Sequence, residues 1–102
     1  MRGLLEPVAT TVAALEQTDL NRAMELHPEV ALRDESFGAL AYHYGNRRLV
    51  FLKSRPLVEL VSSLGSHATA KEAVESLIPS AEQAAYLAAL SNLERSEVIR
   101  ER

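Results

Sequence analysis

The stretch that decides the fold is FGALAYHYGNRRLVFLKSRPLVEL, residues 37–60. Two runs of alternating apolar residues lie on either side of Gly45 and Asn46. Glycine readily takes the positive φ that the first central position of a type II′ turn requires, so this pair predicts a β-hairpin with a two-residue turn. After Pro56 the apolar residues follow helical spacing, so the hairpin leads directly into a helix.

The predicted turn also fixes which residues face one another across the hairpin. It places Tyr42 opposite Leu49. Leu40 then lies opposite Phe51, and these four large apolar side chains share one face of the sheet, which we expect to be the core face. The opposite face is smaller and more mixed, with Ala39, Ala41, His43, Arg48, Val50 and Leu52. Because that face includes apolar residues, we expect another part of the chain to cover Val50 and Leu52.

Upstream of the hairpin, the segment EVALR, residues 29–33, predicts a first strand. It follows a His-Pro pair, which disfavours helix, and it ends at polar residues 34–36. Before it lies an N-terminal arm, residues 1–25, in which Val8, Val12 and Leu15 have helical spacing. A helix and a frayed or merely docked arm both remain open for this segment.

Three helices are predicted after the hairpin, each with its own boundary signals. The first begins at Pro56 and ends at Gly65. The second is preceded by a capping box of Thr69 and Glu72 and ends at Pro79. The third is preceded by a capping box of Ser80 and Gln83. The residues after Ser96 are highly charged, and we expect them to form a frayed tail.

The order of these elements predicts a small α+β domain, in which a three-stranded antiparallel sheet is followed by three helices. A winged-helix-like arrangement is one topology that fits this order. The predicted organisation is an arm over residues 1–25, a folded domain over residues 26–95 and a charged tail over residues 96–102.

Composition restricts the classes of protein that this chain can represent. Of its 102 residues, 47% are hydrophobic and 25% are charged, which is typical of a single folded domain. The chain has no cysteine, which excludes disulfides, thiolate nucleophiles and protein-held iron–sulfur clusters. Its apolar runs are too short for a transmembrane helix or a secretory signal, so we expect a cytoplasmic protein with no membrane partner.

The sequence does not indicate an enzyme. The three histidines lie far apart and form no HExxH-like ligand pair, so we expect no metal site. There is no GxSxG nucleophile elbow, and the four glycines do not form a phosphate-binding loop. We therefore expect no catalytic residues and no cofactor.

Charge is distributed unevenly along the chain. The formal net charge is −3, and no Lys or Arg occurs between Ser80 and Glu94, which argues against nucleic acid as a partner of the third helix. By contrast, residues 36–58 contain no acidic residue. This basic segment carries four cations close together, namely Arg47, Arg48, Lys53 and Arg55.

Two interpretations of the basic segment remain open at this point. Cations beside an edge strand can simply prevent strands of different molecules from pairing. Alternatively, the edge is meant to pair with an extended acidic peptide, whose side chains would enter a groove formed by Val50, Leu52 and the third helix. A winged-helix DNA-binding regulator and an oligomer with mutually paired edges are further alternatives.

The segment LHPEVALRDESFGALAYHYGNRRLVFLKS, residues 26–54, resembles the mycofactocin biosynthesis peptide chaperones. Together with the pyrroloquinoline quinone peptide chaperone, these belong to the PqqD-like RiPP recognition elements. The HP-x-VALR start, the FGAL-x-YH-x-G-x-RRL-x-FLKS core and the spacing between them carry the resemblance. It spans roughly residues 26–95 and is strongest in the hairpin.

The resemblance implies a three-stranded sheet and three helices in a winged-helix arrangement. It also implies a non-catalytic chaperone that binds the acidic leader of a ribosomally made precursor peptide. The implied partner enzyme is a radical S-adenosylmethionine maturase, which decarboxylates and crosslinks the C-terminal Val-Tyr of the precursor. In the family, the leader lies along the third strand beside the third helix.

Carried onto this chain, the resemblance assigns a contact strand, Arg48, Leu49, Val50, Phe51 and Leu52, and a helical wall, Tyr86, Ala89, Leu90 and Leu93. The wall residues are chosen by helical periodicity, and Tyr86 equally fits an ordinary core aromatic residue. The four cations of the basic segment, Arg47, Arg48, Lys53 and Arg55, would steer the acidic leader and help to set its direction.

Overall fold

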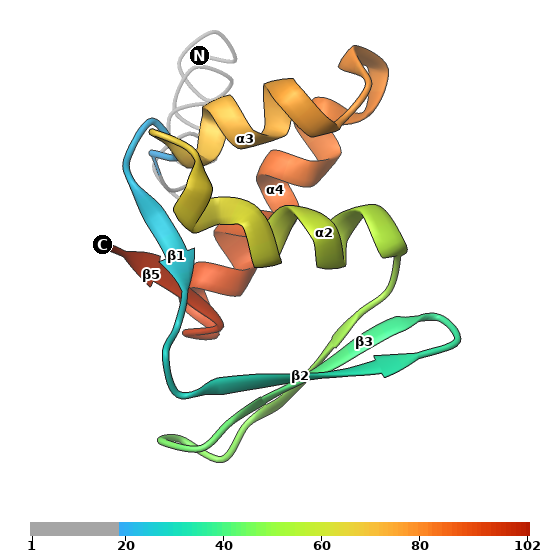
Figure 1. Ribbon diagram of the computed structural model, residues 1–102, viewed down its shortest axis with the longest axis vertical. Helices are drawn as coiled ribbons and strands as arrows, with labels where there is room; N and C mark the ends of the chain where they lie inside the picture. Colours follow the sequence, from blue (N-terminus) through green and yellow to red (C-terminus); the bar gives the residue numbers. More distant parts are fainter. Residues whose placement is uncertain (1–18) are drawn as a thin grey trace, which may run out of the picture.

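A computed structural model describes residues 19–102 as a sheet of three strands with helices packed on one of its faces (Figure 1). The strands are β1 (Met24–Leu26), β2 (Val30–Glu35), β3 (Gly38–His43), β4 (Leu49–Leu52) and β5 (Ile99–Glu101). The helices are α2 (Arg55–Ser63), α3 (Ala70–Leu77) and α4 (Gln83–Arg95), and 3₁₀ turns span Leu64–Ser66 and Ser80–Glu82. The predicted α+β class is confirmed, while the predicted helix in the arm lies outside the described residues.

The three main strands form an antiparallel sheet in the order β2-β3-β4. The predicted hairpin register is confirmed, because Tyr42 pairs with Leu49 and Leu40 pairs with Phe51. The predicted two-residue turn is wrong. The closing hydrogen bond joins the N–H of His43 to the carbonyl of Arg48 at 2.9 Å. The positive φ, 63°, occurs at Arg47 and not at Gly45.

The side chain of His43 explains why this longer turn is stable. Its Nδ1 accepts hydrogen bonds from the backbone N–H groups of Gly45, at 3.0 Å, and Asn46, at 3.1 Å. The imidazole is buried, with 3% of its surface exposed, so these bonds are partly shielded from water. His43 therefore supplies the acceptor that two turn amides would otherwise lack.

The face of the sheet that the helices cover is the opposite of the predicted one. Ala39 and Leu52 are fully buried, whereas Leu49 is 55% exposed and Phe51 is 53% exposed. α2 packs on β3 and β4 from the side of the small residues. Alanine side chains let a helix approach a strand closely, so this side gives the better packed interface. The expected cover over Leu52 is confirmed.

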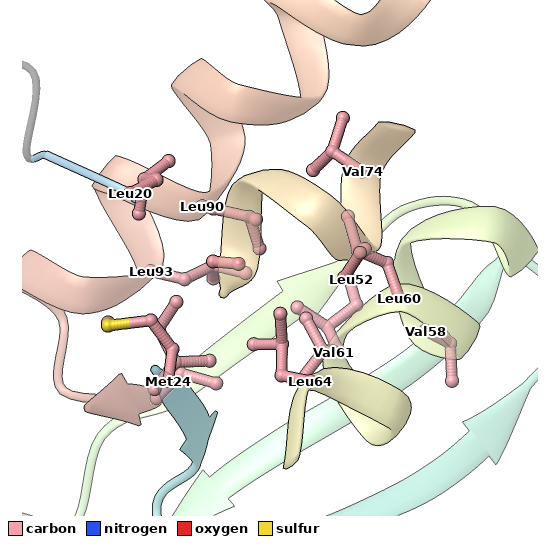
Figure 2. Close-up of a cluster of buried hydrophobic side chains, with 14 of the residues drawn as sticks. Leu20, Met24, Leu52, Val58, Leu60, Val61, Leu64, Val74, Leu90 and Leu93 are labelled. Atoms are coloured by element: carbon pink, nitrogen blue, oxygen red, sulfur yellow. The ribbon is translucent and has the colours of Figure 1, made fainter. Parts of the chain in front are cut away.

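The core lies between this covered face and the helices. Figure 2 shows Leu60, Val61 and Leu64 gathered with Leu52 of β4. Leu90 and Leu93 of α4 belong to the same cluster. Two residues that precede the sheet, Leu20 and Met24, are also buried in it. Residues 19–25, which we assigned to the N-terminal arm from the sequence, are therefore held against the domain by hydrophobic packing.

The predicted helix boundaries are partly confirmed. Ser54 caps α2 by accepting the N–H of Leu57, and Thr69 caps α3 by accepting the N–H of Glu72. The capping box expected from Ser80 and Gln83 is wrong, because the Gln83 amide donates to the carbonyl of Ile78 at 2.9 Å. We expected Gly65 to end the first helix in the left-handed conformation that glycine often takes there, but the chain continues at this position as the 3₁₀ turn Leu64–Ser66.

The frayed tail expected after Ser96 is wrong, because β5 pairs with β1. The paired residues Glu25 and Arg100 form an ion pair at 2.9 Å. Arg22 binds Glu94 of α4 at 2.7 Å and Glu101 of β5 at 3.0 Å, and the hydrogen bond to Glu94 is the main cause of its raised pKa.

None of the helices within residues 19–102 is long and apolar enough to cross a membrane.

Gly38→Ala is expected to lower the free energy of unfolding by about 2 kcal/mol or more. Gly38 has a φ of 150°, and a methyl group there would overlap the carbonyl oxygen of Leu52 in β4. Urea denaturation followed by circular dichroism measures the effect. Gly65→Ala is the matched control, because nothing lies within 4 Å of its added methyl group. Equal stability of the two variants would contradict this account of the β3–β4 contact.

His43→Leu is expected to destabilise the chain by about 1–3 kcal/mol, because the two turn amides of Gly45 and Asn46 lose their acceptor. His67→Leu serves as the control, since the His67 imidazole has no hydrogen-bond partner among residues 19–102. Denaturant titrations of both variants provide the comparison. If the two histidine variants lose the same stability, the Nδ1 bonds do not organise the turn.

Candidate functional site

β4 is the edge strand of the three-stranded sheet. It pairs with β3 on one side, and no other strand of the described residues pairs with its second side. In Figure 1 the hairpin extends from the helices at one end of the molecule. The open edge predicted from sequence is therefore present in the part of the chain that the structure describes.

The hydrogen bond that closes the hairpin decides which backbone groups point away from the sheet. The N–H of His43 donates to the C=O of Arg48 at 2.9 Å, so these residues lie opposite each other at a hydrogen-bonding position, and such positions alternate along an antiparallel ladder. Val50 and Leu52 therefore direct their N–H and C=O groups toward β3. The C=O of Arg48 does so as well, while its N–H donates to Oδ1 of Asn46 in the turn. Leu49 and Phe51 direct theirs outward, so these two residues offer the free backbone donors and acceptors of the edge.

Cations flank this edge at both of its ends. Arg47 and Arg48 precede β4 and Lys53 follows it, and all three are exposed. None of these three side chains has an ion-pair partner among residues 19–102. The fourth cation of the basic segment, Arg55, lies 3.4 Å from Asp34. Three of the four cations of the basic segment thus have no ion-pair partner in the part of the chain that the structure describes, and they can meet a negatively charged partner.

The proposed contact strand divides between surface and core. Leu49 and Phe51 are exposed on the face away from the helices, and Val50 is half-buried against the core on the helix side. Leu52 belongs to the core and has no exposed surface. Of the β4 residues whose side chains lie on the helix side, Val50 is therefore more accessible to a guest peptide than Leu52.

The predicted helical wall is also divided. Tyr86 is half-buried, and its hydroxyl lies 3.2 Å from the Ser54 hydroxyl, just beyond the end of β4. Ala89 is half-buried as well. Leu90 and Leu93 belong to the core cluster, with 0% and 6% of their surfaces exposed. The structure brings Tyr86 to the edge strand and keeps the two leucines beneath the surface.

A groove lies on the other side of the sheet, where sequence reasoning did not expect one. Its volume is about 380 Å³, and its lining residues are Ala31, Leu32, Arg33, Leu40, Tyr42, Tyr44 and Leu49. The groove was missed because the large apolar residues of the hairpin were assigned to the core. The small size of Ala39 and Ala41 on the opposite face was the signal that could have identified the covered side.

The fold brings together two of the histidines that are distant in sequence. His27, Glu29 and His43 offer metal-ligand atoms that all lie within 4.8 Å of one another, and the two imidazole rings are 4.4 Å apart. However, Nδ1 of His27 accepts the N–H of Glu29 at 3.0 Å, and Nδ1 of His43 accepts the turn amides. In a neutral imidazole Nε2 then carries the proton and cannot ligate a metal. We assign both rings to the organisation of the adjacent turns.

Comparison with known proteins identifies relatives over nearly the whole chain. The model of the peptide chaperone MftB family matches residues 23–100. Peptide chaperone MftB from Mycobacterium ulcerans is 42% identical over 102 residues, which cover 97% of this chain and 94% of the relative. The protein of the same name from Mycolicibacterium smegmatis is 42% identical over 93 residues, which cover 90% of this chain and 91% of the relative.

A third relative, peptide chaperone MftB from Mycobacterium tuberculosis, is 38% identical over 103 aligned positions, which cover 97% of this chain and 94% of that protein. No solved structure shows a significant match. The family match includes the sheet, all described helices and most of β5. On this similarity, the chain belongs to the peptide chaperone MftB family.

Proposed function

We propose that this chain is a non-catalytic chaperone that binds the acidic leader of the mycofactocin precursor peptide and presents it to a radical S-adenosylmethionine maturase. The observation that carries the proposal is the open edge of β4. Its outward backbone groups at Leu49 and Phe51 lie between cations that have no ion-pair partner within residues 19–102, Arg47 and Arg48 on one side and Lys53 on the other. The names of the relatives support a peptide as the ligand.

The leader binds as an additional strand beside β4. Backbone hydrogen bonds to Leu49 and Phe51 supply affinity that does not depend on the guest sequence. Guest side chains alternate between the two faces of the extended sheet. Those on the helix side meet Val50 and Tyr86, which are both half-buried and packed against the core. This contact selects guests with apolar residues at alternate positions.

The cations act mainly on encounter and orientation. The chain as a whole carries a net charge of −3, so an acidic peptide is repelled by most of the molecule and attracted locally by the basic segment. Exposed ion pairs are individually weak, and they are screened by salt. Charge therefore guides the leader to β4, and the backbone bonds with the half-buried residues hold it there.

The chemistry of maturation belongs to the partner enzyme in this proposal. The chaperone holds the leader in one extended conformation, and because it also binds the enzyme, it raises the effective concentration of the precursor there. The alternative function, a winged-helix regulator that binds DNA, would use α4 as the reading helix. That helix carries no Lys or Arg before Arg95, so phosphate contacts along its length are not available.

Hydrogen exchange followed by NMR tests strand addition directly. In the free chain, the amides of Leu49 and Phe51 are expected to exchange rapidly, while those of Val50 and Leu52 are protected by β3. Adding the leader peptide should protect the first pair and leave the second unchanged, because only the outward amides gain a partner. Uniform protection of all four amides, or protection of none, would contradict pairing at this edge.

Salt and charge reversal test the role of the cations. Leader affinity, measured by fluorescence anisotropy, is expected to fall as NaCl rises. Arg48→Glu should weaken binding by about three- to tenfold at low salt, because it replaces attraction by repulsion at the edge.

Lys71→Glu is the matched control, because Lys71 is exposed on α3, at the far end of the molecule from the hairpin (Figure 1). Equal losses in the two variants would show that net charge, and not the basic segment, attracts the leader. Duplex DNA at low salt is added in parallel, and binding to it with higher affinity than to the leader would favour the regulator.

A further inference from the structure

Large hydrophobic side chains are exposed together on the sheet face that points away from the helices. Tyr44 is 64% exposed, Leu49 55%, Phe51 53% and Phe37 41%. Leu40 and Tyr42 add half-buried surface between them. We call this surface, with the groove of about 380 Å³ that it contains, the outer face. Contiguous exposed patches of this kind mark interaction sites in folded proteins.

The aromatic residues of the outer face contact one another in pairs. The rings of Phe37 and Phe51 lie 5.6 Å apart, and those of Tyr42 and Tyr44 lie 4.8 Å apart in an edge-to-face arrangement. Rigid aromatic side chains around a groove are typical of the residues that dominate binding energy at protein interfaces. The paired rings thus give the outer face an aromatic surface beside the groove.

The charges around the outer face restrict what can bind there. Arg33 of β2 is paired with Glu35 at 2.8 Å, while Arg47 and Lys53 at the two ends of β4 have no ion-pair partner within residues 19–102. The rim is therefore net positive. A second copy of the chain would present the same positive rim, and like charges oppose such pairing. A partner with carboxylates around an apolar centre is complementary.

We propose that the outer face is the docking surface for the maturase, which would contribute an apolar patch ringed by Asp and Glu side chains. This inference rests on the proposed function, because it assigns a surface to the partner enzyme named there. Leu49 and Phe51 belong to both surfaces, since their backbone groups form the β4 edge and their side chains lie on the outer face. A leader bound at the edge would therefore lie along the margin of the docked enzyme.

The geometry of the sheet separates the two surfaces for an experiment. Strands in a sheet are about 4.8 Å apart, so a guest strand beside β4 would lie about 14 Å from β2. Ala31 of β2 is exposed, pairs with Tyr42 and lines the groove. A substitution at Ala31 therefore changes the outer face without touching a guest at the β4 edge.

The test compares Ala31→Glu with Ala84→Glu, which makes the same change at an exposed alanine of α4. Tyr44→Ser is a second outer-face variant in the turn. Calorimetry measures binding of the leader peptide alone and of the purified maturase alone, and circular dichroism verifies folding. Ala31→Glu and Tyr44→Ser are expected to bind the maturase at least tenfold more weakly and the leader within twofold of the parent chain. Ala84→Glu should leave both affinities unchanged.

Maturase binding within twofold of the parent in both outer-face variants overturns the proposal. Equal losses of leader and maturase binding overturn it as well, because the outer face would then belong to the peptide site. A concentration-dependent dimer that Ala31→Glu dissolves, seen by sedimentation, assigns the face to a second copy instead. If the parent chain does not bind the leader but the outer-face variants still lose maturase binding, the proposed function is refuted. The docking inference is then retained.

Discussion

The structure depends on the packing of α2 against the small-residue face of β3. Ala39 and Ala41 are almost completely buried, and they let α2 lie close to the strand. The apolar residues of α2 and Leu52 then close the core over this face. Because a sheet alternates its side chains between two faces, burying the alanines leaves Leu49 and Phe51 exposed. The same contact therefore creates the core and the outer face.

The turn between β3 and β4 sets the second constraint. His43 accepts two turn amides and closes the hairpin opposite Arg48, which fixes the register of the ladder. That register decides that Leu49 and Phe51, and not their neighbours, carry the outward backbone groups. The buried His43 therefore influences the candidate site indirectly, because it determines which residues of β4 direct their backbone groups outward. Gly38 has a comparable role at the other end of the hairpin, where only glycine fits against β4.

Edge and outer face meet along β4, and this arrangement gives one short strand two uses. A guest strand requires free backbone groups and benefits from nearby cations, while an enzyme surface requires apolar area with complementary charge. Arg47 and Lys53 lie at the ends of both surfaces, so the same charges can guide a peptide and orient a protein. The opposite end of the domain is built differently. There Arg22 joins α4 to β5 through ion pairs, which serve to hold the C-terminal strand in place.

Local pattern in the sequence was sufficient for the hairpin register, the starts of α2 and α3, the α+β class and the clustering of cations beside β4. These features depend on residues close together in the chain, such as Thr69 with Glu72, so short-range spacing encodes them. Which sheet face became the core was decided by tertiary packing, since alternation defines two faces but not which of them a helix covers, and only the small size of Ala39 and Ala41 marked that face in the sequence. Tertiary packing also decided that β5 pairs with β1 and that Leu90 and Leu93 lie beneath the surface. Those outcomes depend on contacts between distant segments, whose packing energies no local pattern records.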